Sequence, residues 1–179
     1  MNVCIRNEEP KDIDTIYELN ASAFESNEEA VLVNRLRGSG SLTLSLVAEV
    51  NGHIVGHIAF SPIVIEGAND MNLFALGPMA VAPSEQRKEI GSKLIRHGLE
   101  KLGGSGADAV FLIGHPEYYP KFGFKPSAST FGIKSTYDVL DEVFMALELA
   151  PGVLEKVTGV ARYSKEFEEW EASNESICH

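Results

Sequence analysis

The sequence has few cysteines, few basic residues and no long apolar run, and each shortage excludes a class of protein. Two cysteines, Cys4 and Cys178, are too few among 179 residues for the disulfide framework of a small secreted domain. No apolar run approaches the roughly 20 residues that a membrane-spanning helix needs. The first residues, MNVCIRNEEPKD, lack the basic-then-apolar order of a secretory signal peptide. The expected location is the cytoplasm.

Basic charge is also scarce, since 15 Lys and Arg oppose 26 Asp and Glu and leave a formal net charge of −11. Such a surface repels nucleic-acid phosphates and anionic membranes, so neither is an expected partner, whereas it tolerates a cationic amine. The chain is long enough for one domain with a full core, and its 44% apolar content is that of an ordinary globular protein. We expect a monomer or a homodimer.

Hydrophobic periodicity predicts a mixed α/β protein with a mostly antiparallel sheet. Asn51-Gly52 suits the positive φ angles of a two-residue turn and predicts a hairpin. A strand, a helix and a strand over residues 72–114 predict one right-handed crossover between parallel strands. The expected elements are a strand over residues 3–6, helices over 8–24 and 28–37, strands over 42–50, 53–65 and 72–83, a helix over 90–102, and strands over 107–114, 144–150 and 157–164.

The run NLFALGPMAVAP is apolar almost throughout, as in a central strand that is buried on both faces. Gly77-Pro78 interrupts it, because proline cannot donate a hydrogen bond to a neighbouring strand. The pair therefore predicts a bulge, or a strand that splays from its neighbour and leaves backbone groups for a ligand.

The stretch PSEQRKEIGSKLI follows that strand and leads into the next helix. Arg87 and Lys88 supply positive charge, Gly91 permits close approach, and the first N–H groups of the helix can point at a pyrophosphate. An ordinary surface loop before a helix is the alternative. The stretch is neither a G-x-G-x-x-G turn nor a P-loop. Glu89 is unexpected here, because it places an anion where an anionic ligand would bind.

The stretch GHPEYYPKFGF follows the next buried strand and places Tyr118 and Tyr119 beyond its carboxyl end, where ligands bind in α/β sheets. A phenol can donate a proton to a thiolate leaving group. Aromatic packing without a catalytic role is the alternative for both tyrosines.

Taken together, the two stretches resemble the GNAT N-acetyltransferase family. PSEQRKEIGSKLI is similar to that family's acetyl-CoA motif, Q/R-x-x-G-x-G/A, with Gln86 at the first position and Gly91 at the last. YPKFGF resembles its Y-x-x-x-G-F segment, with Tyr119 four residues before Gly123. The order LGPMAV, IGSKLIRHGLE and YYPKFGF is similar to a bacterial and archaeal branch of predicted N-acetyltransferases. The resemblance extends from Val3 to about Ser164.

The resemblance implies a single-domain GNAT-like acyltransferase fold and a reaction in which a primary amine attacks the thioester of acetyl-CoA directly. Tyr119 would protonate the departing thiolate, and neither a metal nor a covalent enzyme intermediate is implied. Backbone groups of the splayed strand would pair with the pantetheine arm, and the turn would hold the pyrophosphate. The implied cofactor-binding residues are Met79, Ala80, Val81, Gln86, Arg87, Lys88, Glu89, Ile90, Gly91 and Ser92.

Glu89 stands where the family motif has glycine. A glutamate disfavours the backbone conformations that glycine allows, and its carboxylate would lie near the pyrophosphate unless it points into solvent. The N–H donors of the turn survive every substitution except proline. A non-catalytic CoA-binding module and an interaction domain without a CoA site are the two alternative functions.

The general base is not identified by the sequence. Glu28 and Glu29 open the second expected helix, which borders the acceptor groove in this family, and either could act through a water. Solvated carboxylates at a helix start are the alternative. Four histidines lie within the expected domain, and their spacing is not that of metal ligands. They are His53, His57, His97 and His115. The expected domain covers residues 1–164, and the acidic tail over 165–179 could fray.

Overall fold

The computed structural model describes residues 2–172, except for the side chains of residues 171 and 172. The chain forms two compact units, Met1–Ser61 with Leu76–Glu100 and Pro62–Ala75 with Lys101–His179. Two strands and one helix contribute residues to both units, so the chain passes between them three times. No helix among the described residues is long and apolar enough to cross a bilayer. The predicted domain limits at residues 1–164 stay a prediction.

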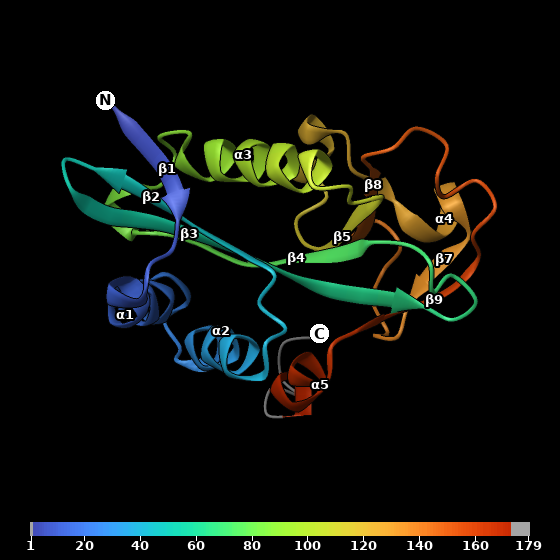
Figure 1. Cartoon of the computed structure of the whole chain (residues 1–179), viewed down its shortest axis with the longest axis horizontal. Coiled ribbons are helices and arrows are strands. Elements are labelled where there is room, and N and C mark those ends of the chain that lie inside the picture. The colour runs from blue at the N-terminus through green and yellow to red at the C-terminus, as the bar shows by residue number, and fades with distance from the viewer. Residues whose placement is uncertain (1, 173–179) are drawn as a thin grey trace. The chain divides into compact units, whose positions relative to one another are not determined.

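The first unit is an antiparallel meander covered by helices. Strands β1, β2, β3 and β4 are neighbours in that order, and β1 with β2 and β2 with β3 are antiparallel. In Figure 1, α1 and α2 lie on one side of these strands and α3 lies on the other. The elements are β1 (Val3–Asn7), η1 (Pro10–Asp12), α1 (Ile13–Phe24), α2 (Glu28–Ser39), β2 (Leu44–Val50), β3 (His53–Ile65), β4 (Leu73–Val81), η2 (Pro83–Glu85) and α3 (Ile90–Gly104).

The second unit contains the parallel pairing. Strand β4 pairs in parallel with β5 over Leu73–Ala75, which confirms the predicted crossover through α3. β8 lies antiparallel to β5 and to β6, and β9 lies antiparallel to the end of β3 and parallel to β7. The elements are β5 (Ala109–Ile113), η3 (Tyr119–Phe122), β6 (Lys125–Pro126), α4 (Ser127–Phe131), β7 (Ile133–Ser135), β8 (Phe144–Glu148), β9 (Gly159–Tyr163) and α5 (Lys165–Ala172).

The predicted elements are present, with the hairpin turn as the sharpest agreement. Asn51 and Gly52 have φ angles of 51° and 80°, the left-handed pair that a two-residue hairpin turn requires. The sequence pattern did not predict η3, β6, α4 or β7, nor the parallel pairing of β7 with β9. Part of the acidic tail forms the helix α5. This helix packs against β9, where the rings of Phe167 and Tyr163 have centroids 5.0 Å apart. Residues 173–179 of that tail lie outside the described part of the chain.

Helix α3 packs directly on β3 because glycine stands at both points of closest approach. A Cβ atom on Gly98 would lie 2.5 Å from the ring of Phe60, and one on Gly56 would lie 2.9 Å from Ile90. Phe60 and Leu94 are both fully buried. The missing side chains therefore bring the helix into van der Waals contact with the strand.

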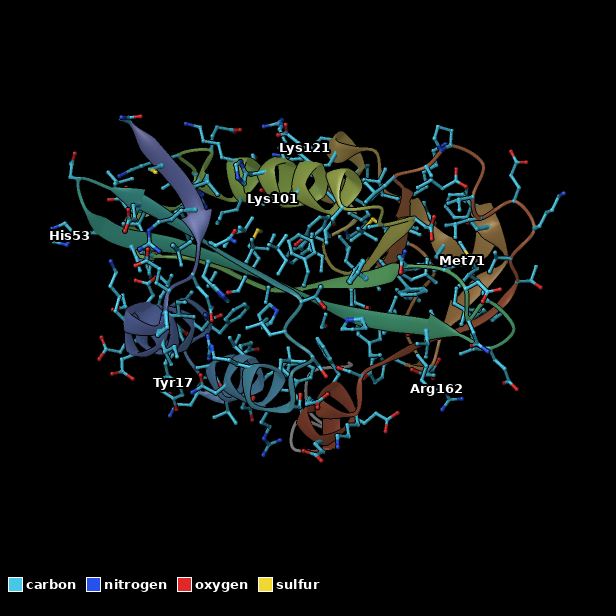
Figure 2. All side chains as sticks on the ribbon, viewed as in Figure 1. Tyr17, His53, Met71, Lys101, Lys121 and Arg162 are labelled. Atoms are coloured by element: carbon cyan, nitrogen blue, oxygen red, sulfur yellow. The ribbon has the colours of Figure 1, made fainter. Side chains whose placement is uncertain are left out.

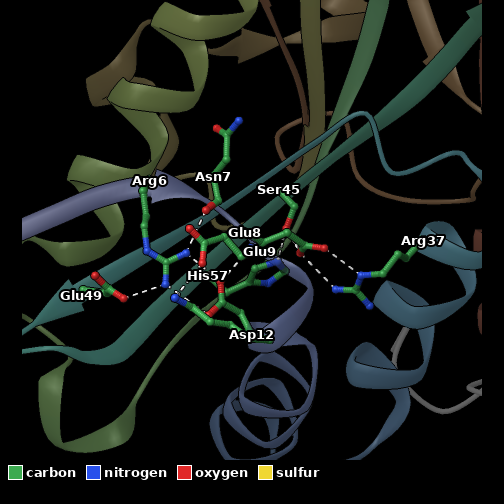
Figure 3. A network of polar contacts seen from close by, with 10 residues as sticks. Arg6, Asn7, Glu8, Glu9, Asp12, Arg37, Ser45, Glu49 and His57 are labelled. Atoms are coloured by element: carbon green, nitrogen blue, oxygen red, sulfur yellow. Dashed lines mark hydrogen bonds and ion pairs between the residues drawn. The ribbon is translucent and has the colours of Figure 1, made fainter.

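Polar side chains tie the other face of the first unit together (Figure 3). Arg6 of β1 donates two hydrogen bonds to Asp12, at 2.6 and 3.1 Å, and a third to Glu49 of β2 at 2.6 Å. Asp12 also accepts the backbone N–H of Glu9. The Arg6 guanidinium holds the pKa of the Asp12 carboxyl below its usual range, although burial opposes it. This cluster fixes the chain between β1 and α1.

A second chain of hydrogen bonds runs through His57, whose side chain is fully buried. The Asn20 amide donates to the Ile16 carbonyl at 2.9 Å and to His57 Nδ1 at 3.2 Å. Because the Ile16 carbonyl can only accept, it fixes which end of the amide is the donor. Nδ1 is therefore the acceptor, and the proton of the neutral ring is on Nε2, which donates to Ser45 Oγ at 2.9 Å.

The direction of the chain continues to the edge of the unit. Ser45 Oγ donates to Glu8 Oε2, and Arg37 of α2 donates to both Glu8 oxygens at 2.8 and 3.0 Å. Burial alone would raise the pKa of Glu8, but the hydrogen bonds from Arg37 and Ser45 outweigh it and hold that pKa below the usual value. Burial lowers the pKa of His57 to about 4. The chain therefore joins α1, α2, β2 and β3 only while the imidazole is neutral.

Candidate functional site

The turn between β4 and α3 has an unusual backbone. Arg87 and Glu89 adopt φ angles of 62° and 63°, in the left-handed region that few residues other than glycine enter. Left-handed residues that alternate with right-handed or extended ones turn successive N–H groups to one side, which makes an anion-binding concavity. Glu89, which stands where the family motif has glycine, therefore has a backbone conformation that glycine adopts more easily.

Helix α3 continues this concavity. Its first intrahelical bond joins the Lys93 N–H to the Glu89 carbonyl at 3.0 Å, so the N–H groups of the preceding first turn point out of the N-terminal end. Ile90 is buried at 1% exposure and anchors the helix start against the strands. The helix dipole adds partial positive charge at this end. This arrangement suits a phosphate or pyrophosphate.

The side chains of the turn leave its main-chain groups accessible. Gln86, Arg87, Lys88 and Glu89 are all exposed, so the Glu89 carboxylate is in solvent, where salt screens it. Lys88 forms an ion pair with Glu85 at 3.1 Å. Gln86 Nε2 donates to the Val81 carbonyl at 3.1 Å and closes the turn onto the end of β4. The Gln86 side chain thus has a structural role beside the cofactor role that the motif implies.

Strand β4 leads into this turn. Ala80 is buried, and Met79 and Val81 on either side of it are half-buried. Gly77-Pro78 is a cis peptide, and Gly77 has a φ angle of 146°. The pairing of β4 with β5 over Leu73–Ala75 ends before this peptide. The end of the pairing before Gly77-Pro78 agrees with a strand that splays from its neighbour at this point. The pairing of Met79–Val81 with a pantetheine arm stays a prediction.

In the second unit, Tyr119 opens the short helix η3 and is 9% exposed. Its ring packs edge-on against Tyr118 and Phe124, with centroids 5.1 and 6.0 Å apart. A Cβ atom on Gly114 would lie 2.4 Å from the ring, so any larger residue at position 114 would clash with the tyrosine as it is placed. Burial raises the pKa of Tyr119 to about 12, with a smaller contribution from Tyr118. The phenol is therefore fully protonated at neutral pH.

Gly123 and Lys121 complete this loop. Gly123 has a φ angle of 100° and ends η3 by donating to the Pro120 carbonyl at 3.0 Å, which is the physical reason for glycine at this point of YPKFGF. The ammonium of Lys121 lies 4.1 Å from the centre of the Tyr118 ring. The same loop lines a shallow surface depression with His115, Pro116, Glu117 and Tyr118.

The four histidines considered in the sequence have separate environments. His53 is exposed at the end of the hairpin and points away from the strands (Figure 2), whereas His57 is the buried member of the hydrogen-bond chain. His97 is half-buried on α3, and His115 is exposed in the loop after β5. Among the described residues, no group of three or more His, Cys, Asp or Glu side chains is arranged to hold a metal.

The two acidic residues that open α2 differ in their surroundings. One oxygen of Glu29, Oε2, is buried and has no hydrogen-bond partner among the described residues. Burial raises the pKa of Glu29, the neighbouring Glu28 carboxylate adds to the shift, and the backbone N–H of Glu29 partly opposes it. The sequence suggested both residues equally, because spacing alone does not show which carboxylate is desolvated.

The mixed, mostly antiparallel sheet with one parallel crossover is the architecture expected of the GNAT family, and the comparison with known families agrees. Residues 4–127 match the acetyltransferase (GNAT) domain family. The chain belongs to the GNAT acetyltransferase family.

Similar proteins are found among bacterial N-acetyltransferases. The chain is 35% identical over 164 residues to the uncharacterized N-acetyltransferase YhbS of Escherichia coli K12, covering 91% of this chain and 97% of YhbS. The crystal structure of Escherichia coli YhbS in complex with CoA has a TM-score of 0.90 at 34% identity, and covers 94% of this chain and 93% of that one. A GNAT acetyltransferase from Brucella melitensis in complex with acetyl-CoA has a TM-score of 0.78 at 37% identity, over 93% and 98% of the two chains.

Proposed function

We propose that the protein transfers the acetyl group of acetyl-CoA to a primary amine by direct attack on the thioester. The observation that carries this proposal is the turn from Gln86 to Ser92, where two left-handed residues precede the N-terminus of α3. The sequence of this turn resembles the family's acetyl-CoA motif, with Gln86 at the first position and Gly91 at the last. Structures of similar proteins in complex with CoA and acetyl-CoA support the same ligand.

The cofactor would be held chiefly by main-chain groups. The N–H groups of the turn would donate to the pyrophosphate, and exposed Arg87 and Lys88 would add positive charge. Backbone groups of Met79, Ala80 and Val81 would pair with the pantetheine arm. Because the Val81 carbonyl already accepts a hydrogen bond from Gln86, the arm would share or displace that bond.

The chemical step needs one acid and one base. The amine nitrogen attacks the thioester carbonyl and loses one proton to a base, a C–N bond forms, the C–S bond breaks, and the thiolate leaves. Tyr119 would donate its proton to that thiolate, which a phenol with a pKa of about 12 still carries at every physiological pH. The phenolate then regains a proton from solvent, and neither cysteine takes part.

A CoA-binding module without turnover is the second candidate, and Glu89 is the observation that favours it. A glutamate with a φ angle of 63° is strained, and its charge opposes an anionic ligand. Such a residue is tolerated most easily where tight cofactor binding is not under demand.

Two measurements separate the candidates. Isothermal titration calorimetry with acetyl-CoA, with adenosine and NAD as controls, tests the cofactor site, and absence of heat and of a thermal shift with millimolar acetyl-CoA would contradict both candidates. Thiol release from acetyl-CoA is then followed with a diamine, a lysine-containing peptide and an aminoglycoside. Amine-dependent release identifies the enzyme, whereas binding without release identifies the module.

A further inference from the structure

The ring of Tyr119 has two neighbours that the core of the second unit holds in place. Phe124 is 2% exposed and meets the Tyr119 ring edge-on, with centroids 6.0 Å apart. Gly114 lies so close that a Cβ atom there would be 2.4 Å from the ring, and its N–H donates to the Val143 carbonyl at 2.9 Å. Packed side chains and paired backbone groups of this kind have little freedom to move, so these two neighbours are fixed.

A third neighbour, Tyr118, is different because it is only half-buried. Its ring lies edge-on to the Tyr119 ring, at an interplanar angle of 87° and with centroids 5.1 Å apart. Two aromatic rings attract one another in this edge-to-face arrangement. The position of Tyr119 on this side therefore depends on where the Tyr118 ring is held.

Two contacts within the same loop hold the Tyr118 ring. The Lys121 ammonium lies 4.1 Å from the centroid of Tyr118 and 5.1 Å from that of Phe122, and both distances are within the range of about 6 Å for a cation–π interaction. The Phe122 ring also meets the Tyr118 ring edge-on, with centroids 5.4 Å apart. Lys121 is exposed and the two rings are half-buried, so the cation covers the aromatic pair from the solvent side. These contacts are made by the Tyr118 ring rather than by its hydroxyl.

We propose that Tyr118 is a positioning residue for the acid of the acetyl transfer, and that its ring keeps the Tyr119 phenol where it can protonate the thiolate. The inference rests on the proposed function, in which Tyr119 is that acid. Without the Tyr118 ring, the Tyr119 side chain gains room to turn about its χ angles, and its hydroxyl spends less time in the productive place. Proton transfer needs hydrogen-bond distance between phenol and sulfur, and a displacement of about 1 Å can lower a rate by about 10²-fold.

Tyr118→Leu and Tyr118→Phe are the matched pair of variants, because leucine removes the ring and phenylalanine removes only the hydroxyl. Turnover is measured with the amine that wild type acetylates fastest. We expect Tyr118→Leu to lower kcat by about 10- to 10²-fold, with the calorimetric affinity for acetyl-CoA within about threefold of wild type. Tyr118→Phe should keep kcat within about twofold of wild type, since it keeps every ring contact.

A double-mutant cycle distinguishes positioning from a general loss of structure. If Tyr118 acts through the Tyr119 hydroxyl, Tyr118→Leu has nothing left to misplace once that hydroxyl is absent. The kcat of the double variant should then equal that of Tyr119→Phe within about twofold. A general loss of structure would instead lower kcat by the same factor in both backgrounds.

Lys121→Met tests the same arrangement without altering a ring, so it decides the matter if Tyr118→Leu does not fold. Methionine keeps most of the side-chain length and removes the charge. We expect kcat to fall by about two- to fivefold, the factor by which an exposed cation–π contact shifts an equilibrium. Lys121→Arg should restore kcat, and the fall should be absent in the Tyr119→Phe background.

The outcomes separate this inference from the proposed function. Absence of amine-dependent thiol release by wild type, or wild-type turnover in Tyr119→Phe, would overturn the proposed acid and the positioning role together. Wild-type turnover in Tyr118→Leu, or an equal loss of kcat in the wild-type and Tyr119→Phe backgrounds, would overturn the positioning role alone. Weaker acetyl-CoA binding with unchanged kcat would also overturn it, because Tyr118 would then belong to the cofactor site.

Discussion

The free energy of unfolding should fall steeply between pH 7 and pH 5 because of His57. The pKa of this imidazole is about 4 in the folded protein, against 6.5 as the ordinary value. The unfolded chain therefore binds a proton at a pH at which the folded protein does not. Because the pKa of the histidine is lower in the folded protein, its contribution to the free energy of unfolding is complete above pH 6.5. This contribution is lost as the pH falls from 6.5 toward 4.

The magnitude follows from the size of the shift. A pKa difference of this size corresponds to about 3.4 kcal/mol when the titration is complete. About 2 kcal/mol of this should already be lost at pH 5. Glu8 acts in the same direction but in a lower window: its pKa is held below the usual value, so its contribution is lost only as the pH falls below about 4.5. Glu29 acts in the opposite direction because its pKa is raised, so the contribution of the imidazole is obtained from the difference between wild type and a His57 variant.

The perturbation is His57→Gln, which can still donate to Ser45 but cannot be protonated. At pH 7 it should lower stability by about 1–3 kcal/mol, because the Asn20 amide loses its acceptor. Urea unfolding followed by circular dichroism at pH 7, 6 and 5 gives the free energy for both proteins. Wild type should lose about 2 kcal/mol more than the variant over this interval. Parallel pH profiles of the two proteins would refute the reasoning, since the imidazole would then be protonated equally easily in the folded and unfolded states.

Three further predictions concern the tyrosine loop, the turn and α3. Tyr119→Phe should lower turnover by about 10²-fold with unchanged acetyl-CoA affinity in calorimetry, whereas Tyr118→Phe, the control, should matter little. Equal activity of Tyr119→Phe and wild type would mean that water or another residue protonates the thiolate. Glu89→Gly should tighten acetyl-CoA binding by a few-fold to tenfold, most at low salt, and leave stability equal or higher because the backbone there is left-handed; weaker binding would mean that the carboxylate supports the site. Gly98→Ala should lower the free energy of unfolding in urea by about 1–3 kcal/mol, since its methyl group meets the buried ring of Phe60. Gly103→Ala, with open space around it, should be neutral or stabilising, and equal stabilities of the two variants would show that the ring moves aside without cost.

The regular part of the fold could be predicted because local signals there are strong and agree with one another. Asn51-Gly52, the apolar run of β4 and the periodicity of α3 each specify one element without reference to distant residues. The segment from Tyr119 to Ser135 could not be predicted in the same way. Its elements are two to five residues long, too short for any periodicity to develop, and distant strands such as β8 and β9 define them by pairing.

The candidate site could be predicted in part for the same reason. The turn and the Tyr119 loop are contiguous in sequence, so their motifs are visible as strings of residues. The environments of His57 and Glu29 are not visible. The hydrogen-bond partners of His57 come from two other segments, at Asn20 and Ser45, and Ser45 donates in turn to Glu8 of a third. Burial distinguishes Glu29 from Glu28, and adjacent identical residues carry no sequence signal for it.

The backbone contacts proposed for the turn from Gln86 to Glu89 affect which substitutions its sequence can accept during evolution. Its proposed ligand contacts come chiefly from the polypeptide backbone, while the side chains of Arg87 and Glu89 are exposed. Substitutions that keep the left-handed conformations at Arg87 and Glu89 would leave these backbone contacts in place, and would change affinity only through the charge near the ligand. Selection would then act on whether the backbone keeps its conformation rather than on residue identity, and Glu89 shows that even a residue strained in this conformation can keep it.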